Sequence, residues 1–194
     1  MKILLRDDWR STVEHVDNSI VKKFKPGHEL DTKHMHTQAW VNHINSFSDQ
    51  YKHFPRILEC NSNTLITEYI PGDNLRDCRF QSYSKGLHAQ LDFFKKTQLL
   101  YYRFIANILE YNQQNNIYMY HSDLNHANMF MVEDRIVCID IDSVRIDYNW
   151  VENNWIQLPS AIMQHDADEL NYQYNKAEQN NLKFKLNKNK YSHD

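Results

Sequence analysis

A polar loop followed by a short hairpin constrains this chain more than any other stretch. The loop runs from His121 to Asn128 in the order His-Ser-Asp-Leu-Asn-His-Ala-Asn. Two short segments rich in β-forming residues, 129–132 and 136–139, follow it, and Asp140 comes directly after the second. Because the two strands of a hairpin run antiparallel, their outer ends lie side by side. We therefore predict that Asn128 and Asp140 lie close together.

The oxygen-bearing side chains of this stretch suit phosphoryl transfer. Carboxylate and amide oxygens are the ligands that Mg²⁺ prefers, which makes Asn128 and Asp140 candidate metal ligands. Asp123 could accept the proton of an attacking hydroxyl group, and an acid, an amide and a second acid in this order are typical of kinase-type sites. The alternative is that Asp123 and Asn128 only cap the loop and that Asp140 is an ordinary strand-end acid. The joint spacing favours Asp123, Asn128 and Asp140 as a catalytic set.

Composition narrows the class of protein. A chain of 194 residues, of which 41% are hydrophobic, fits one compact domain or two small lobes that share a cleft. The formal net charge of −3 gives no electrostatic reason to expect nucleic-acid binding. No apolar run approaches the ~20 residues that cross a bilayer, and the N-terminus lacks the apolar core of a secretory signal. Three cysteines, without zinc-type spacing, favour a reducing cytoplasm.

The rest of the chain predicts a β-rich first part and a helical second part. The predicted strands cover residues 2–6, 12–16, 19–24, 56–60 and 64–70, and the predicted helices cover 32–46, 88–111 and 165–180. Pro71-Gly72 separates the two parts. We therefore predict an N-lobe over residues 1–70, with a sheet and one helix, and a C-lobe over residues 71–194, with the catalytic loop, the metal-binding hairpin and a short helical tail.

This order of elements resembles the protein-kinase-like fold, which is α+β and bilobal, with an antiparallel β-rich N-lobe and a small, mainly helical C-lobe. Within it, Asp123-Leu124-Asn125-x-x-Asn128 followed by Ile139-Asp140-x-Asp142 looks like the lipopolysaccharide-core sugar kinases, the 3-deoxy-manno-octulosonic acid (Kdo) kinase group. The segment 65–72, Leu-Ile-Thr-Glu-Tyr-Ile-Pro-Gly, is similar to the hinge that this group shares with aminoglycoside and choline phosphotransferases. The resemblance covers roughly residues 12–145.

The resemblance implies ATP and Mg²⁺ as cofactors and assigns nucleotide-binding residues. Lys22 matches the strand lysine that pairs with the phosphates of the nucleotide. Lys23 is the register alternative, because a slip of one residue turns a side chain to the other face of a strand. Glu68 and Ile70 match the hinge positions whose backbone groups bind the adenine edge.

Three further residues of the motif carry expectations from the resemblance. His121 would tie the catalytic loop to the neighbouring strand. Asp142 would be a second metal ligand or, alternatively, a turn residue at the strand end. Asn125 occupies the position where Ser/Thr protein kinases usually carry lysine, which favours a small-molecule acceptor over a protein.

The chain departs from the family pattern at three places, one of which is the short segment after Asp140. The loop before Thr12 contains no glycine, so Arg10, Ser11 and Thr12 would have to replace the backbone N–H groups that usually close on the phosphates. Gln38 stands at the helix position where the family usually has the glutamate that orients the lysine. Glu29 is the remaining candidate acid, nearer the start of that helix.

The sequence thus predicts a cytoplasmic, ATP-dependent phosphotransferase that moves the γ-phosphate to a hydroxyl of a small, sugar-like or lipopolysaccharide-core acceptor. A lipid-linked glycan acceptor would bring the protein to the inner face of the membrane, where the basic segment 183–190 could assist as a peripheral contact. The alternatives are a catalytically weak pseudokinase that binds nucleotide or a partner protein, and a compact atypical protein kinase. The sequence does not indicate an oligomeric state.

Overall fold

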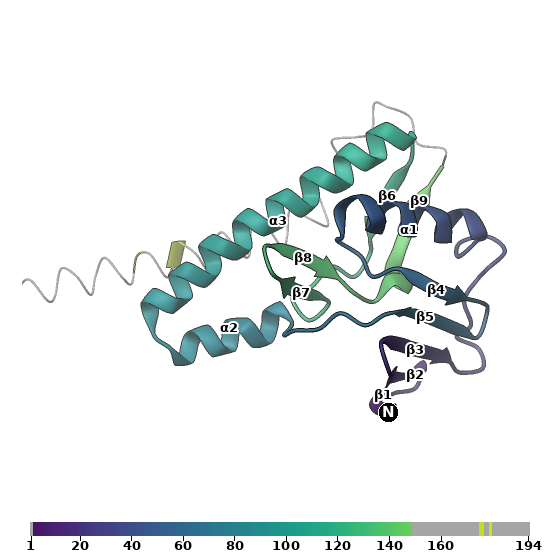
Figure 1. Cartoon of the computed structure of the whole chain (residues 1–194), viewed down its shortest axis with the longest axis horizontal. Helices are drawn as coiled ribbons and strands as arrows, with labels where there is room; N and C mark the ends of the chain where they lie inside the picture. Colours follow the sequence, from purple (N-terminus) through teal and green to yellow (C-terminus); the bar gives the residue numbers. More distant parts are fainter. Residues whose placement is uncertain (1, 149–174, 177–178, 180–194) are drawn as a thin grey trace, which may run out of the picture.

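The structure, a computed structural model, describes residues 2–148 together with 175, 176 and 179 (Figure 1). The described chain forms an antiparallel sheet with one helix, followed by a mainly helical part with two short pairs of strands. This arrangement confirms the predicted α+β, bilobal class. The polar helix predicted at 165–180 lies mostly outside the described residues, as does the basic segment 183–190. No helix of the described part is long and apolar enough to span a bilayer.

The N-lobe sheet has five antiparallel strands in the order β1-β2-β3-β5-β4. The strands are β1 (Lys2–Asp7), β2 (Ser11–Val16), β3 (Ser19–Phe24), β4 (Ile57–Cys60) and β5 (Thr64–Glu68). A two-residue turn, Asp17-Asn18, joins β2 to β3, so that Val16 pairs with Ser19. Asp17 adopts a left-handed backbone conformation (φ 52°), which aspartate tolerates better than most residues. This turn sets the register of β3 and therefore the faces on which its lysines lie.

Helix α1 (Gln38–Tyr51) packs on the sheet through one apolar face. Trp40, Ile44 and Phe47 are all buried and recur at helical spacing. The helix begins six residues later than predicted, because the Asp31 carboxylate accepts backbone N–H groups of the preceding segment and holds it as a turn. Thr37 then caps the helix by accepting the N–H of Trp40 at 3.3 Å.

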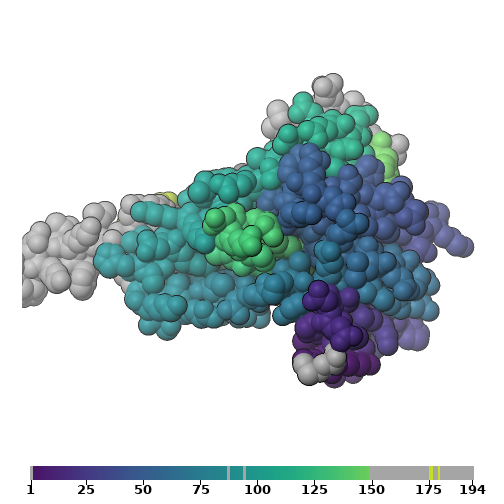
Figure 2. All heavy atoms as spheres, in the orientation of Figure 1, coloured from purple at the N-terminus to yellow at the C-terminus, as the bar shows by residue number. Residues whose placement is uncertain are grey.

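The C-lobe is built on two helices, α2 (Leu75–Ser84) and α3 (Leu87–Asn115), which project away from the sheet in the space-filling view (Figure 2). Helix α2 was not predicted, because it is largely polar and only Leu75 and Ser82 are buried. Four short strands follow: β6 (Tyr118–His121), β7 (Met129–Val132), β8 (Arg135–Cys138) and β9 (Val144–Asp147). β7 pairs with β8 as the predicted hairpin, whereas β9 returns to pair with β6 and was not predicted.

One cluster of buried residues runs through both lobes. Phe47 of α1 lies edge-on against Tyr111 of α3, with ring centroids 5.3 Å apart. His53, just after α1, donates from Nδ1 to the carbonyl of Ile136 in β8 and accepts at Nε2 from the amide of Asn107 in α3. These contacts fix the helices against the β7–β8 hairpin. Because the core is continuous, the predicted division of the chain at residue 70 stays a prediction.

Replacing Phe47 with alanine should destabilise the whole domain. Its ring is fully buried, so the substitution removes apolar contacts and leaves a cavity, at a cost of about 3–5 kcal/mol in the free energy of unfolding. Leu99→Ala, on the exposed side of α3, serves as the matched control and should stay within about 0.5 kcal/mol of the unsubstituted protein. Denaturant unfolding measures both values, and equal stabilities for the two variants would contradict the packing described here.

Candidate active site

The polar loop is fixed between its two flanking strands by backbone hydrogen bonds. Ser122, directly after β6, donates both its N–H and its hydroxyl to the carbonyl of Ser143, at 2.9 and 2.7 Å. At the other end, the N–H of Ile139 donates to the carbonyl of Asn128 at 2.8 Å and closes the hairpin. Asn128 and Asp140 therefore flank the same end of the hairpin, as the sequence predicted.

His121 joins the loop to the hairpin from the interior. Its ring is buried; Nδ1 accepts the N–H of Asp123 at 3.2 Å, and Nε2 lies 2.8 Å from the carbonyl of Ile139. Since Nδ1 accepts, Nε2 carries the proton and donates, which corresponds to a neutral imidazole. Burial lowers the pKa of His121, an effect that the hydrogen bond to Ile139 only partly opposes. The expectation that His121 ties the loop to the neighbouring strand is confirmed.

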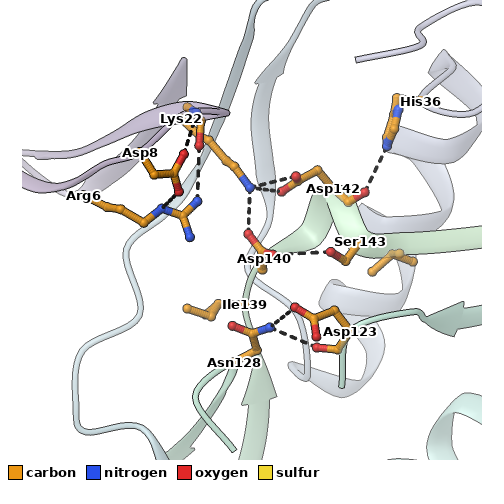
Figure 3. Close-up of polar contacts among 12 residues, drawn as sticks. Arg6, Asp8, Lys22, His36, Asp123, Asn128, Ile139, Asp140, Asp142 and Ser143 are labelled. Atoms are coloured by element: carbon orange, nitrogen blue, oxygen red, sulfur yellow. Dashed lines mark hydrogen bonds and ion pairs between the residues drawn. The ribbon is translucent and has the colours of Figure 1, made fainter. Parts of the chain in front are cut away.

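The carboxylate of Asp123 is oriented by two side-chain amides, of which Figure 3 shows that of Asn128. Asn128 donates from Nδ2 to the Asp123 carbonyl at 2.9 Å and to Oδ2 at 3.0 Å. Asn125 donates to Oδ1 at 2.9 Å. Because the amide nitrogen of Asn128 is committed to Asp123, its amide oxygen is the end that remains for a cation. The base candidate and one metal-ligand candidate therefore position each other.

Lys22 links the sheet to the acidic segment after β8 (Figure 3). Its Nζ lies 2.7 Å from Asp140 Oδ1 and 2.7 Å from both carboxylate oxygens of Asp142. Burial alone would raise the pKa of Asp140, but the ion pair and hydrogen bond with Lys22 outweigh it, and the pKa is lowered. Lys23 points to the other face, where its half-exposed side chain lies 3.7 Å from Glu14. Of the two register alternatives, Lys22 is the lysine at the cleft.

A tight turn brings the two carboxylates to the same side. Asp140 has a left-handed backbone (φ 61°, ψ 49°), and Ser143 donates its N–H to the Asp140 carbonyl and its hydroxyl to Oδ2. Asp142 then lies two residues on, in a short 3₁₀ turn, and its carbonyl is held by Nε2 of the buried His36 at 3.1 Å. The turn after β8 is thus held by hydrogen bonds, and it places the carboxylates of Asp140 and Asp142 against Lys22.

Two cavities meet at this point. An apolar cavity of about 410 Å³ is lined by β-sheet residues, by the end of β5 and by the hairpin, including Ile20, Leu65, Glu68, Ile70, Asn128 and Ile139. A polar cavity of about 690 Å³ lies beside it and includes Arg10, Ser11, His28, Glu29, Asp123 and Arg145. Four residues line both cavities: Arg6, Lys22, Asp140 and Asp142. Asp123, the candidate base, therefore lines the polar cavity, whereas Glu68 and Ile70 line the apolar cavity.

Not every predicted residue reaches the cleft. Gln38 is exposed on the first turn of α1, bonds to Asn42 and lines neither cavity. Thr12 also lines neither cavity, and its hydroxyl donates to Asp7. Ser11 is fully buried beside the polar cavity. Gln38 therefore does not take the place of the helix glutamate that orients the lysine in the kinases the sequence resembles. In this chain Lys22 is paired with the two aspartates after β8 instead.

Arg6, Asp8 and His36 reach the site although sequence reasoning did not place them there. Asp8 and His36 line the polar cavity, and Arg6 lines both cavities. The available signals were weak. Arg6 and Asp8 stand in a glycine-free charged loop, and His36 precedes a predicted helix in a histidine-rich segment that shows no ligand spacing.

The donor set at the cleft fits Mg²⁺. The carboxylate of Asp140, the amide oxygen of Asn128 and the carboxylate of Asp142 are all hard oxygen ligands. Within the described part of the chain, no group of three or more His, Cys, Asp or Glu side chains is arranged to hold a metal ion. Mg²⁺ sites in phosphotransferases need fewer protein ligands, because substrate phosphates and water complete the coordination.

Comparison with known proteins rests on the fold. No protein-family profile and no curated protein sequence matches the chain. The fold is similar to that of the Rv3197 protein of Mycobacterium tuberculosis, solved in complex with erythromycin, with a TM-score of 0.55 at 12% identity. That match covers 90% of this chain and 53% of the other, so the chain spans about half the length of its neighbour.

Two further matches are weaker, with TM-scores below 0.5. One is a choline/ethanolamine kinase family protein from Mesorhizobium loti, with a TM-score of 0.42 and 13% identity over 90% of this chain and 69% of that chain. The other is the ADP-bound aminoglycoside phosphotransferase APH(2'')-Ib, with a TM-score of 0.41 and 14% identity over 100% and 86%. The similarity to Rv3197 shows a shared fold, and the architecture described above is the bilobal α+β arrangement expected of the protein-kinase-like fold.

The buried His121 should make stability depend on pH. Because its folded pKa lies below the ordinary value of 6.5, the unfolded chain binds the proton first as the pH falls. Stability is therefore fully present above pH 6.5 and is lost below it, at up to about 1.4 kcal/mol per pH unit from this residue, until the lowered pKa is reached. Asp140, whose pKa is lowered from 3.8, contributes only in more acidic solution.

Denaturant unfolding between pH 7.5 and 5.0 measures this slope. His121→Gln should reduce it, whereas His34→Gln, at an exposed position, should leave it unchanged. Equal slopes for the two variants would show that the buried imidazole is not the group that takes up the proton.

Proposed function

We propose that the protein is an ATP-dependent phosphotransferase that transfers the γ-phosphoryl group to a hydroxyl of a small, sugar-like acceptor. One observation carries the proposal: Asp123, Asn128 and Asp140 lie together where an apolar and a polar cavity meet, with Lys22 between the sheet and the acids. Phosphoryl transfer needs an apolar slot for the nucleobase, a cation for the phosphates and a carboxylate near the acceptor hydroxyl, and this arrangement matches those needs.

The apolar cavity is the proposed nucleotide site. Glu68 ends β5 and Ile70 follows it, and both line this cavity, where their backbone groups would bind the adenine edge. Lys22 would give up some of its contacts with Asp140 and Asp142 and pair with the phosphates instead. Asn128 and Asp140 would hold Mg²⁺, with Asp142 as a further ligand. When bound, Mg²⁺ supplies positive charge to the phosphate oxygens.

The polar cavity is the proposed acceptor site. Asp123 would accept the proton of the acceptor hydroxyl as its oxygen bonds to the γ-phosphorus and the bond to the bridging oxygen of ADP breaks. Most of the rate enhancement would come from alignment and from fixed charges, since no covalent intermediate with the protein is needed. Trp9, which is 65% exposed, lies edge-on to His28 beside this cavity and could cover the apolar face of a sugar ring. A lipopolysaccharide-core or lipid-linked glycan is the narrower form of this proposal.

The experiment that tests the proposal is a screen with γ-labelled ATP and Mg²⁺ against sugars, aminoglycosides, choline and lipid-linked glycans. Label that appears in one acceptor class supports the proposal and names the substrate. ATP binding without label in any acceptor, and without ATP consumption, would contradict it.

A pseudokinase is the second candidate, and a specific observation favours it. Lys22 is bonded to both Asp140 and Asp142, so the phosphate lysine is already engaged by the metal-ligand candidates. Such a site could bind nucleotide for regulation without turnover. A rise in melting temperature with ATP and Mg²⁺, without ATP consumption in the acceptor screen, would identify this function.

Substitution of the two acids should separate binding from chemistry. Asp123→Asn should lower kcat by about 10²- to 10⁴-fold with little change in ATP affinity, because it removes only the proton acceptor. Asp140→Asn should abolish transfer and also weaken ATP binding in Mg²⁺, because it removes a metal ligand. Asp134→Asn, at a fully solvated turn position, is the matched control. Unchanged turnover in Asp140→Asn would refute the assignment.

Lys22 and Lys23 provide an internal pair of variants. Lys22→Met should weaken ADP affinity by on the order of 10-fold or more, because it removes the cation between the two cavities. Lys23→Met makes the same change on the solvent face of the same strand and should bind ADP like the unsubstituted protein. Titration calorimetry measures both affinities, and a loss in Lys23→Met alone would reverse the register assignment.

A further inference from the structure

In the loop between β1 and β2, the backbone N–H groups of Arg10 and Ser11 already have an acceptor within the protein. The Asp8 carboxylate accepts the N–H of Arg10 and the N–H of Ser11 through one oxygen, each at 2.8 Å. In a glycine-rich loop such N–H groups are free to close on phosphates. Here an internal carboxylate occupies them, and these two hydrogen bonds hold the pKa of Asp8 below its ordinary value. The N–H groups of Arg10 and Ser11 are therefore not available to a nucleotide.

The same carboxylate fixes a cation beside the loop. Nε of Arg6 lies 3.1 Å from the other oxygen of Asp8, and Nη2 of Arg6 donates to the hydroxyl of the buried Ser11 at 3.2 Å. An arginine has five N–H donors. Among the described residues, Asp8 and Ser11 engage two of them, which leaves three for a ligand. Figure 3 shows Arg6 and Lys22 on the N-lobe side, across from Asp140.

Arg6, near the end of β1, is also the cation beside the loop that lies where the two cavities meet. Arg6 and Lys22 are the only cationic side chains of the described chain that line both cavities. Arg10 lies over the ring of Trp9, 4.4 Å from its centroid, and lines only the polar cavity. Lys25 is paired with Asp7 at 2.7 Å. The phosphate chain of a nucleotide whose base lies in the apolar cavity would run past Arg6.

We infer that Arg6, held by Asp8 and Ser11, binds the phosphate chain of the nucleotide in place of a glycine-rich loop. The inference rests on the proposed function, because it assigns a group to that same nucleotide site. A guanidinium suits the task, since its planar fork can bind two phosphate oxygens at once. Asp8 and Ser11 are then positioning residues. They hold the fork in place before the ligand arrives and so reduce the entropy lost on binding.

The test compares ADP with adenosine, in Mg²⁺, by titration calorimetry. Arg6→Gln should weaken ADP affinity by on the order of 10- to 100-fold and leave adenosine affinity within about twofold, because only the phosphates lose a contact. Lys25→Gln removes one positive charge beside the same loop, from a side chain that lines neither cavity, and is the matched control for ADP affinity. Arg6→Lys keeps the charge but not the fork and should fall between Arg6→Gln and the unsubstituted protein.

The outcomes separate this inference from the proposed function. If Arg6→Gln, with an unchanged melting temperature, binds ADP as Lys25→Gln does, the inference is overturned while the nucleotide site stands. If the unsubstituted protein binds neither ATP nor ADP, the proposed function fails and the inference fails with it. A loss of ADP affinity confined to Arg6→Gln and Arg6→Lys, with adenosine unaffected, supports the assignment.

Discussion

A single ammonium group between two carboxylates ties this structure together. Lys22 bonds to Asp140 and Asp142, which are 118 and 120 residues away in sequence, and so joins the N-lobe sheet to the turn after β8. Without the cation, two acids two residues apart would face each other. Breaking a fully buried ion pair costs about 3–5 kcal/mol; here the cost is smaller, because the three side chains are 11–23% exposed. The same group that closes the two lobes on each other is also the one proposed to bind phosphate.

Much of the fold could be predicted from the sequence, because strands and long helices carry periodic patterns. The β2–β3 hairpin, the β7–β8 hairpin and helix α3 were expected near their observed positions. Prediction failed where local hydrogen bonds or tertiary contacts decide the structure. The start of α1 depends on the Asp31 carboxylate, and α2 is too polar to show an apolar face. β9 exists because its partner β6 is there, a pairing between distant segments that no local pattern reveals.

The site was predictable where one short segment contains it. The hairpin forces Asn128 and Asp140 together, and His121 lies within two residues of the base candidate. Groups from other segments were harder to assign. Whether Lys22 or Lys23 faces the cleft depends on strand register, which is set by the Asp17-Asn18 turn and the pairing of β3 with its neighbours. Gln38 was placed by analogy with a family pattern, and this chain begins its helix too late for that analogy to apply.

The charges where the two cavities meet suggest how nucleotide and metal depend on each other. Arg6 and Lys22 provide two cations, and Asp8, Asp140 and Asp142 provide three carboxylates, so these five side chains carry one negative charge in excess. A nucleoside triphosphate without a metal ion would meet a site that is negatively charged, like itself. A divalent cation held by Asp140 and the Asn128 oxygen would reverse that excess and free Lys22 for the phosphates. The internal ion pairs thus stabilise the site described here, and under the proposed function they would make binding of the phosphates depend on the metal that accompanies them.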